Sequence, residues 1–134
     1  MRHPESQSQQ ALVRWWAFTH RQFAIPEHLL FSIPNGAFMG GGVMQTKRGM
    51  VPLAVVRANR MKAEGMRDGV SDLFLSVPNK QYHGLYLEMK SAEGRVSPAQ
   101  KEFMEDARKF GYDCVVAHSA DEAREAITNY LEKR

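Results

Sequence analysis

The chain has 134 residues, 43% of them hydrophobic and 25% charged, and its formal net charge is +3. These values are typical of one globular domain, with a mild basic excess that suits a polyanionic partner, and they exclude a disordered chain. The single cysteine, Cys114, excludes an intrachain disulfide framework and a cysteine-based zinc site. No apolar run approaches the roughly 20 residues of a membrane span. Residues 1–10 are polar and lack the core of a signal peptide, so we expect a cytoplasmic protein with no membrane partner.

The first predicted element is a helix over residues 5–23. Leu12 and Trp16 fall on one stripe at helical spacing, and Glu5 lies at the polar end of this stripe. A glutamate in the first turn also complements the helix dipole, so its position has a purely structural explanation as well.

The remaining elements follow from alternating apolar patterns and from turn residues. They are a strand at 29–33, a glycine-rich loop at 36–50, a helix at 51–64, strands at 72–77 and 84–90 joined by a hairpin loop, a helix at 98–110, a strand at 112–118 and a helix at 121–131. A loop as long as 36–50 is more often functional or mobile than idle. The order αβαββαβα predicts an α/β fold in which a small mixed sheet is flanked by helices, within a single domain over residues 1–134.

Three polar residues lie at corresponding positions of the two middle strands. Because side chains alternate along a strand, Asp72, Glu88 and Lys90 can project from one face while the leucines of both strands take the other. Two carboxylates can hold Mg²⁺ or Mn²⁺, and a lysine beside them can position water or stabilise charge on a phosphate. A solvated cross-strand charge pair has the same spacing, so the pattern alone leaves both interpretations open.

The motifs around these residues resemble a known nuclease family. They are Gly69-Val70-Ser71-Asp72, Glu88-Met89-Lys90, Ser97-Pro98-Ala99-Gln100, the turn Ile33-Pro34-Asn35-Gly36 and an early Glu5 followed by Gln7 and Gln9. In order and spacing they resemble the PD-(D/E)XK nuclease superfamily, and more closely its VRR-Nuc (virus-type replication-repair nuclease) family. The resemblance extends from Glu5 to about Leu131 and implies a restriction-endonuclease-like core. Ser71 departs from the proline of the superfamily name, but that proline is not a metal ligand.

The resemblance implies a role for each residue of the site. Asp72 and Glu88 would ligate the metal, with the backbone carbonyl of Met89 as a further ligand. Lys90 would orient or deprotonate the attacking water. Glu5 would hold a second metal, or the water of that metal, from the first helix.

Gln100 has two interpretations. Ser97 and Gln100 have the spacing of a helix capping box, which requires no catalytic role. In terms of the family, Gln100 would lie beside Lys90 and support it. Both roles are compatible.

A basic cluster precedes Asp72 and predicts contact with phosphates. Its members are Lys47, Arg48, Arg57, Arg60, Lys62 and Arg67. A solvated helix face is the alternative for each of them. Asn35 and Gly36 could line the mouth of the site or merely form a turn.

The predicted function is therefore a structure-selective DNA endonuclease dependent on Mg²⁺ or Mn²⁺ and similar to a Holliday-junction resolvase. Two symmetric nicks on a four-way junction need two active sites, so we expect a homodimer. The resemblance also implies a bacterial or phage setting and a role in DNA repair. The alternatives are a nuclease of flaps or nicked duplexes, a non-catalytic DNA-binding module, and a structural domain with a surface ion pair.

Overall fold

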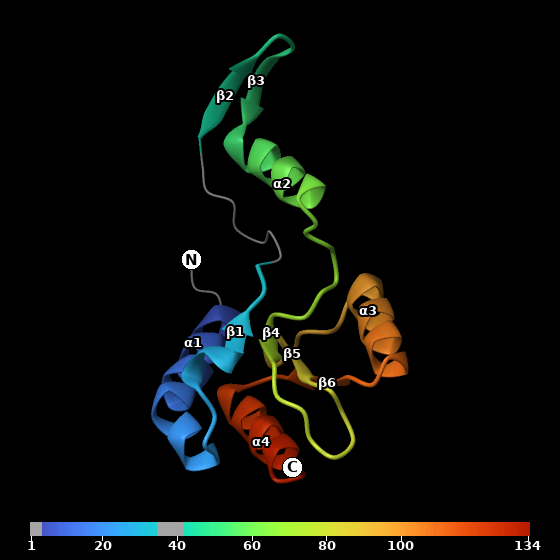
Figure 1. Ribbon diagram of the computed structural model, residues 1–134. Coiled ribbons are helices and arrows are strands. Elements are labelled where there is room, and N and C mark those ends of the chain that lie inside the picture. The colour runs from blue at the N-terminus through green and yellow to red at the C-terminus, as the bar shows by residue number, and fades with distance from the viewer. Residues whose placement is uncertain (1–3, 35–41) are drawn as a thin grey trace. The chain divides into compact units, whose positions relative to one another are not determined.

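The computed structural model of the chain describes residues 4–34 and 42–134 (Figure 1). The chain forms two compact units. We call the first the sheet unit; it comprises Met1–Ile33 and Gly69–Arg134. The second, Pro34–Asp68, we call the hairpin–helix unit. Each unit is described by itself.

The sheet unit contains a mixed four-stranded sheet in the order β1-β4-β5-β6. Its strands are β1 (Leu30–Ser32), β4 (Leu73–Leu75), β5 (Leu85–Met89) and β6 (Asp113–Ala117). The β1–β4 and β4–β5 pairs are antiparallel, whereas β5 and β6 are parallel. The parallel pair is connected through a helix, as a parallel connection requires. The predicted α/β class and mixed sheet are confirmed, and each predicted strand end lies one or two residues too far out.

One face of this sheet carries the hydrophobic core. Leucines of β4 and β5 share this face, because Leu73 pairs with Leu87 and Leu75 with Leu85. They pack against α1 (Pro4–Thr19) and α4 (Ala120–Leu131), in the same buried cluster as Trp16 and Ile127. Because side chains alternate along a strand, the residues between these leucines point to the opposite face of the sheet.

The opposite face is covered by α3 (Pro98–Lys109) and is rich in aromatic side chains. Phe74 and Tyr86 are cross-strand partners with ring centroids 4.5 Å apart. The ring of Phe103 on α3 meets Tyr86 edge-on at 5.0 Å. Edge-to-face contacts of this kind are favourable beyond the area that they bury. Asp72 and Glu88 belong to this face by alternation.

The first helix is shorter than the prediction of 5–23. The α-helix ends at Thr19, and a 3₁₀ turn over His20–Phe23 continues it to Ala24, whose φ of 57° is left-handed. A second 3₁₀ turn, Glu27–Leu29, leads into β1. Trp16 fixes this return of the chain, because its indole N–H donates to the carbonyl of Glu27 at 2.9 Å. A left-handed residue ends a helix, which explains why the helical pattern stops there.

The prediction of a loop in the hairpin–helix unit is wrong. Residues 36–50 were expected to form a loop, but β2 (Val43–Thr46) and β3 (Gly49–Pro52) form an antiparallel hairpin. The helix α2 (Leu53–Ala63) follows directly and begins two residues later than predicted. The five glycines of the segment obscured the two short strands, since glycine is depleted in strands. None of the described residues in β2, β3 or α2 is buried.

Within residues 4–34 and 42–134, no helix is both long enough and apolar enough to cross a bilayer.

Candidate active site at the ends of β4 and β5

Asp72 and Glu88 meet where β4 begins and β5 ends. Asp72 directly precedes Leu73, and Glu88 directly follows Leu87, the partner of Leu73 in the register. The backbone N–H of Met89 donates to Oδ2 of Asp72 at 2.7 Å. The backbone carbonyl of Asp72 accepts from the N–H of Ile33 at 2.8 Å. Asp72 is therefore held on both sides by neighbouring strands.

Glu88 is buried, which is unusual for a carboxylate. Glu88 is only 2% exposed, and its Oε1 atom has no hydrogen-bond partner among the described residues. Burial raises the pKa of Glu88 from 4.5 to about 9, and the hydrogen bond and negative charge of Asp72 act in the same direction. The charge of Lys90 lowers this pKa, and that of Glu5 raises it. A solvated cross-strand charge pair therefore does not describe Glu88.

The amino end of α3 lies against the segment that leads to Asp72. A Cβ atom added to Gly69 would lie 2.5 Å from the backbone of Ala99, and the φ of Gly69 is +84°. Only glycine fits such a close approach in a left-handed conformation. In the sequence, Gly69 stands out only as part of the motif Gly69-Val70-Ser71-Asp72. Its signal is a glycine that comes three residues before a carboxylate at the start of a strand.

Lys90 follows Glu88 by two residues and extends the pairing of β5 with β6. Its backbone N–H donates to the carbonyl of Ala117 at 2.8 Å, and the side chain is half-buried. Because the strand direction is fixed up to Lys90, alternation directs its side chain to the face of Glu88. The charge coupling between the two residues agrees with this placement.

Glu5 comes near this site but does not complete a cluster of ligands. Its Oε1 accepts from the backbone N–H of Ser91 at 3.4 Å, which places the first turn of α1 beside the end of β5. Among residues 4–34 and 42–134, however, no three His, Cys, Asp or Glu side chains group closely enough to hold a metal together. The structure thus brings Asp72 and Glu88 together, and leaves Glu5 at the edge of the site.

The donor atoms at the site fit a hard divalent cation. Asp72 and Glu88 supply carboxylate oxygens, and one of these, Oε1 of Glu88, is buried without a hydrogen-bond donor in the described parts of the chain. A buried carboxylate oxygen in this state is destabilised unless it is protonated or compensated by a positive charge. Oxygen ligands are those that Mg²⁺ and Mn²⁺ prefer.

Gln100 forms the predicted capping box. The hydroxyl of Ser97 accepts from the N–H of Gln100 at 3.2 Å, and Oε1 of Gln100 accepts from the N–H of Ser97 at 2.8 Å. The structural role of this pair is thereby confirmed. A supporting role of Gln100 toward Lys90 stays a prediction.

The predicted basic cluster lies in the hairpin–helix unit. Lys47 and Arg48 form the turn between β2 and β3, and Arg57, Arg60 and Lys62 lie on α2. Arg67 follows the helix and is exposed. The remaining two residues predicted to contact DNA, Asn35 and Gly36, lie outside the described residues.

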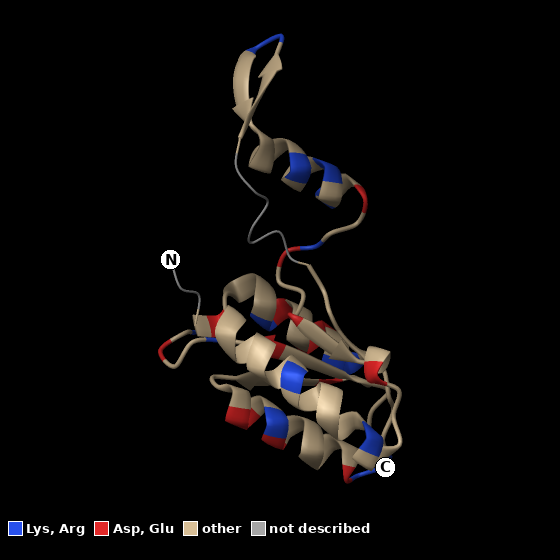
Figure 2. Ribbon diagram, turned by 90° about the vertical axis from the view of Figure 1, so that its left-hand side faces the viewer, with Lys and Arg blue, Asp and Glu red and all other residues tan. Residues whose placement is uncertain are grey.

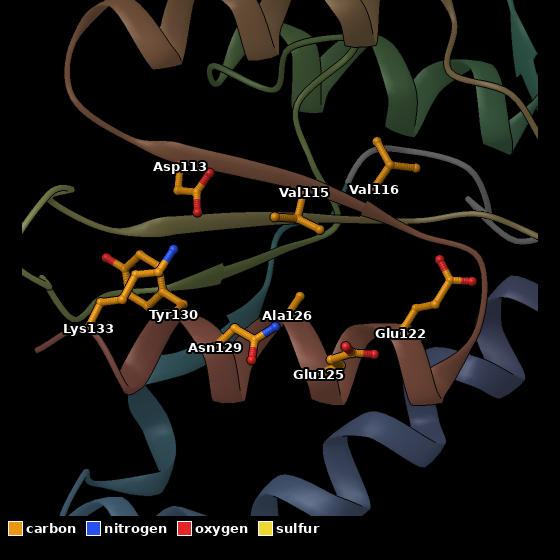
Figure 3. Close-up of a pocket in the computed structure, with 9 residues that line it drawn as sticks. All are labelled: Asp113, Val115, Val116, Glu122, Glu125, Ala126, Asn129, Tyr130 and Lys133. Carbon is orange, nitrogen blue, oxygen red and sulfur yellow. The ribbon is translucent and has the colours of Figure 1, made fainter.

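A separate hollow lies between β6 and α4 (Figure 3). Carboxylates of Asp113, Glu122 and Glu125 line it, with Lys133 as the cationic member of the lining. Such an acidic lining repels phosphate. This hollow is therefore not a candidate for the nucleic-acid site.

Comparisons with known proteins find similarity to one family, the VRR-NUC domain. A family model described as the VRR-NUC domain matches residues 3–121. A solved structure described as a "VRR_NUC domain protein" is similar, with a TM-score of 0.74 and 24% sequence identity; the match covers 98% of this chain and 91% of that chain. At this identity, the likeness shows that the fold is shared. No curated protein matches the chain significantly.

Proposed function

The chain belongs to the VRR-NUC domain family and carries a nuclease-type domain, and on this premise we propose that it is a metal-dependent endonuclease of branched DNA. The observation that carries the proposal is the buried carboxylate of Glu88, which lies beside Asp72 and has an oxygen without a partner in the described residues. A buried carboxyl oxygen without a hydrogen-bond donor is unfavourable for stability alone. Its presence between Asp72 and Lys90 favours a catalytic explanation.

In the proposed mechanism, Asp72 and Glu88 would hold Mg²⁺ or Mn²⁺, with the backbone carbonyl of Met89 as a further ligand. When bound, such an ion supplies charge neutralisation at the phosphate and acidifies water. Lys90 would orient the attacking water, because its side chain shares the face of Glu88, and only a neutral Lys90 amine would also take up a proton from that water. Glu5 contributes a further carboxylate from α1, either directly or through water. Gln100 supports Lys90 from the first turn of α3.

We further propose that the substrate is a four-way junction and that the protein acts as a homodimer. Each chain carries one pair of site carboxylates, Asp72 and Glu88. Symmetric nicks in two strands of a junction need two such sites, which a two-fold dimer supplies. The basic hairpin–helix unit provides the cations that binding to a phosphate backbone requires (Figure 2).

The decisive experiment compares the wild type with Lys90→Ala on labelled four-way junctions, 5′ flaps, nicked duplexes and linear duplexes, with and without Mg²⁺ or Mn²⁺. The matched control is Lys101→Ala, which removes an exposed lysine of α3 outside the site. We expect that Lys90→Ala binds the junction but loses cleavage by at least about 100-fold, in line with the contribution of general acid–base groups. The control should cleave at the wild-type rate.

Each alternative gives a different result in this experiment. Equal cleavage by Lys90→Ala would overturn the catalytic assignment. Cleavage of flaps or nicked duplexes alone would replace the junction substrate. Metal-independent binding of the wild type without any cleavage would show a DNA-binding module on a nuclease fold.

A further inference from the structure

Positive charge is concentrated in the hairpin–helix unit. Residues 34–68 contain six Lys and Arg side chains and two carboxylates, an excess of four positive charges. The whole chain carries +3, so the rest of the chain has a net charge of −1. Figure 2 shows Lys and Arg at the tip of the β2–β3 hairpin and along α2. This unit is therefore the part of the chain that an anionic polymer attracts.

The tip of the hairpin is held in a defined turn. Thr46 pairs with Gly49, so that Lys47 and Arg48 form a two-residue loop. The hydroxyl of Thr46 donates to the carbonyl of Gly49 at 2.7 Å and accepts from the N–H of Arg48 at 3.2 Å. Gly49 has a φ of +112°, which a side chain would strain. The turn therefore presents two exposed cations side by side.

Behind this tip, one face of the hairpin is open and, apart from Gln45, apolar. Val43 pairs with Pro52, and Gln45 pairs with Met50, which puts these four side chains on one face. Val43 is 59% exposed and Met50 is 58% exposed. Large apolar side chains grouped at this exposure mark a surface that contacts a partner. A hairpin and a helix without buried residues also have little stability of their own.

We propose that the β2–β3 hairpin is a DNA-binding arm that enters a groove of duplex DNA. Lys47 and Arg48 contact phosphates, while Val43 and Met50 pack against sugars and base edges. A two-stranded ribbon fits the major groove, and apolar side chains next to cations are typical of proteins that press into base steps. The proposal rests on the proposed function, since it assigns a DNA-binding surface to that nuclease.

Charge favours DNA over a second copy of the chain on this surface. Each hairpin–helix unit has a net charge of +4, so contact between two copies would bring two positively charged surfaces together. Like charges in one interface disfavour association, whereas each cation that meets a phosphate releases counterions. The apolar face alone would suit either partner.

The test measures binding by fluorescence anisotropy in EDTA, over a range of salt, with a labelled junction and a linear duplex. The first variant, Lys47→Ala with Arg48→Ala, removes both cations of the turn. Its control, Lys80→Ala with Lys133→Ala, removes two exposed lysines of the sheet unit whose backbones are hydrogen-bonded to each other at 2.9 Å. The turn variant should bind about tenfold more weakly and lower the slope of log K against log salt by about 1.8, since each phosphate contact contributes about 0.9. The control should stay within about twofold of the wild type.

A second variant, Val43→Ser with Met50→Ser, tests the apolar face. It should bind about fivefold more weakly at an unchanged salt slope, because apolar contacts release no counterions. If the wild type cleaves DNA and the turn variant binds DNA as tightly as the wild type, the arm proposal is wrong and the nuclease proposal stands. If the serine variant instead lowers the molar mass in light scattering without a change in DNA affinity, the face joins two copies and the arm proposal is overturned. If the wild type neither binds nor cleaves DNA, both proposals fail.

Discussion

The N–H of Met89 donates to Oδ2 of Asp72 at 2.7 Å, so the strand that carries Glu88 also orients the neighbouring carboxylate. One hydrogen bond from the backbone to a side chain thus links Asp72 to β5, the strand that carries Glu88. Because Met89 itself is buried in the core on the opposite face, the position of this N–H is fixed by packing. The geometry of the proposed site is therefore a consequence of the sheet register.

Two substitutions of Asp72 separate its charge from its hydrogen bond. Asp72→Asn retains an oxygen that can accept from Met89, so we expect stability close to the wild type and a loss of cleavage of about 100-fold or more. Asp72→Ala leaves the N–H of Met89 without this partner and should lower the free energy of unfolding by about 1–3 kcal/mol. Urea unfolding and junction cleavage measure the two effects. Wild-type cleavage by Asp72→Asn would contradict the role as a ligand.

Glu88 makes the stability of the metal-free protein depend on pH. Its pKa is about 9 in the folded chain, against 4.5 as the ordinary value. Between these values, the folded state retains a proton that the unfolded state has lost. Unfolding then releases a proton, so the contribution of this group to stability is full below pH 4.5 and declines as pH rises toward 9. Urea unfolding in EDTA at pH 5, 7 and 8.5 should show this decline.

The matched variant for this prediction is Glu88→Gln. Glutamine resembles the protonated carboxyl group and does not titrate, so its stability should decline less between pH 5 and 8.5. Added Mg²⁺ should stabilise the wild type more at the higher pH, because metal binding requires the ionised carboxylate. Parallel pH curves for the two proteins would show that Glu88 titrates normally.

Gly69 and Gly65 form a matched pair for testing the contact with α3. Both have positive φ values, +84° and +114°, but an added Cβ at Gly65 meets nothing within 4 Å, whereas at Gly69 it meets Ala99 at 2.5 Å. Gly65→Ala should cost about 1 kcal/mol through backbone strain alone. Gly69→Ala should cost more in thermal unfolding and should also reduce cleavage, because Asp72 is three residues away. Equal losses for both variants would show that the contact with α3 is unimportant.

Ser97 and Gln100 allow the cap and the proposed catalytic support to be distinguished. Ser97→Ala removes the hydroxyl that accepts from the N–H of Gln100 and should lower the free energy of unfolding by about 1 kcal/mol. Cleavage below the unfolding transition should be unchanged. Gln100→Ala should reduce cleavage further than Ser97→Ala does at matched stability. Identical cleavage by the two variants would reduce Gln100 to a capping residue.

The sequence predicted the sheet unit well because its signals are local. Ser97, Pro98 and Gly111 mark the ends of α3, and alternating leucines mark β4 and β5. The shared face of Asp72 and Glu88 followed from the same alternation, and the register agrees with it.

The features that the sequence did not predict depend on contacts between distant parts of the chain, which local patterns do not encode. The burial of Glu88 could not be predicted, because it requires the packing of helices around the end of β5. The β2–β3 hairpin was missed because glycines surround it and its turn, Lys47-Arg48, lacks the Asn-Gly signal typical of two-residue loops. The position of Glu5 beside Ser91 likewise depends on how α1 meets the sheet.

The hydrogen bond between the N–H of Ile33 and the carbonyl of Asp72 closes the chain segment that contains the whole hairpin–helix unit. Since β1 and β4 pair directly, the four-stranded sheet forms without any strand from the hairpin–helix unit. Variation inside residues 34–68 can therefore change the proposed DNA-binding surface without changing Asp72 or Glu88. An engineer could therefore exchange the proposed arm as a module between Ile33 and Gly69, and so change the substrate of the proposed nuclease.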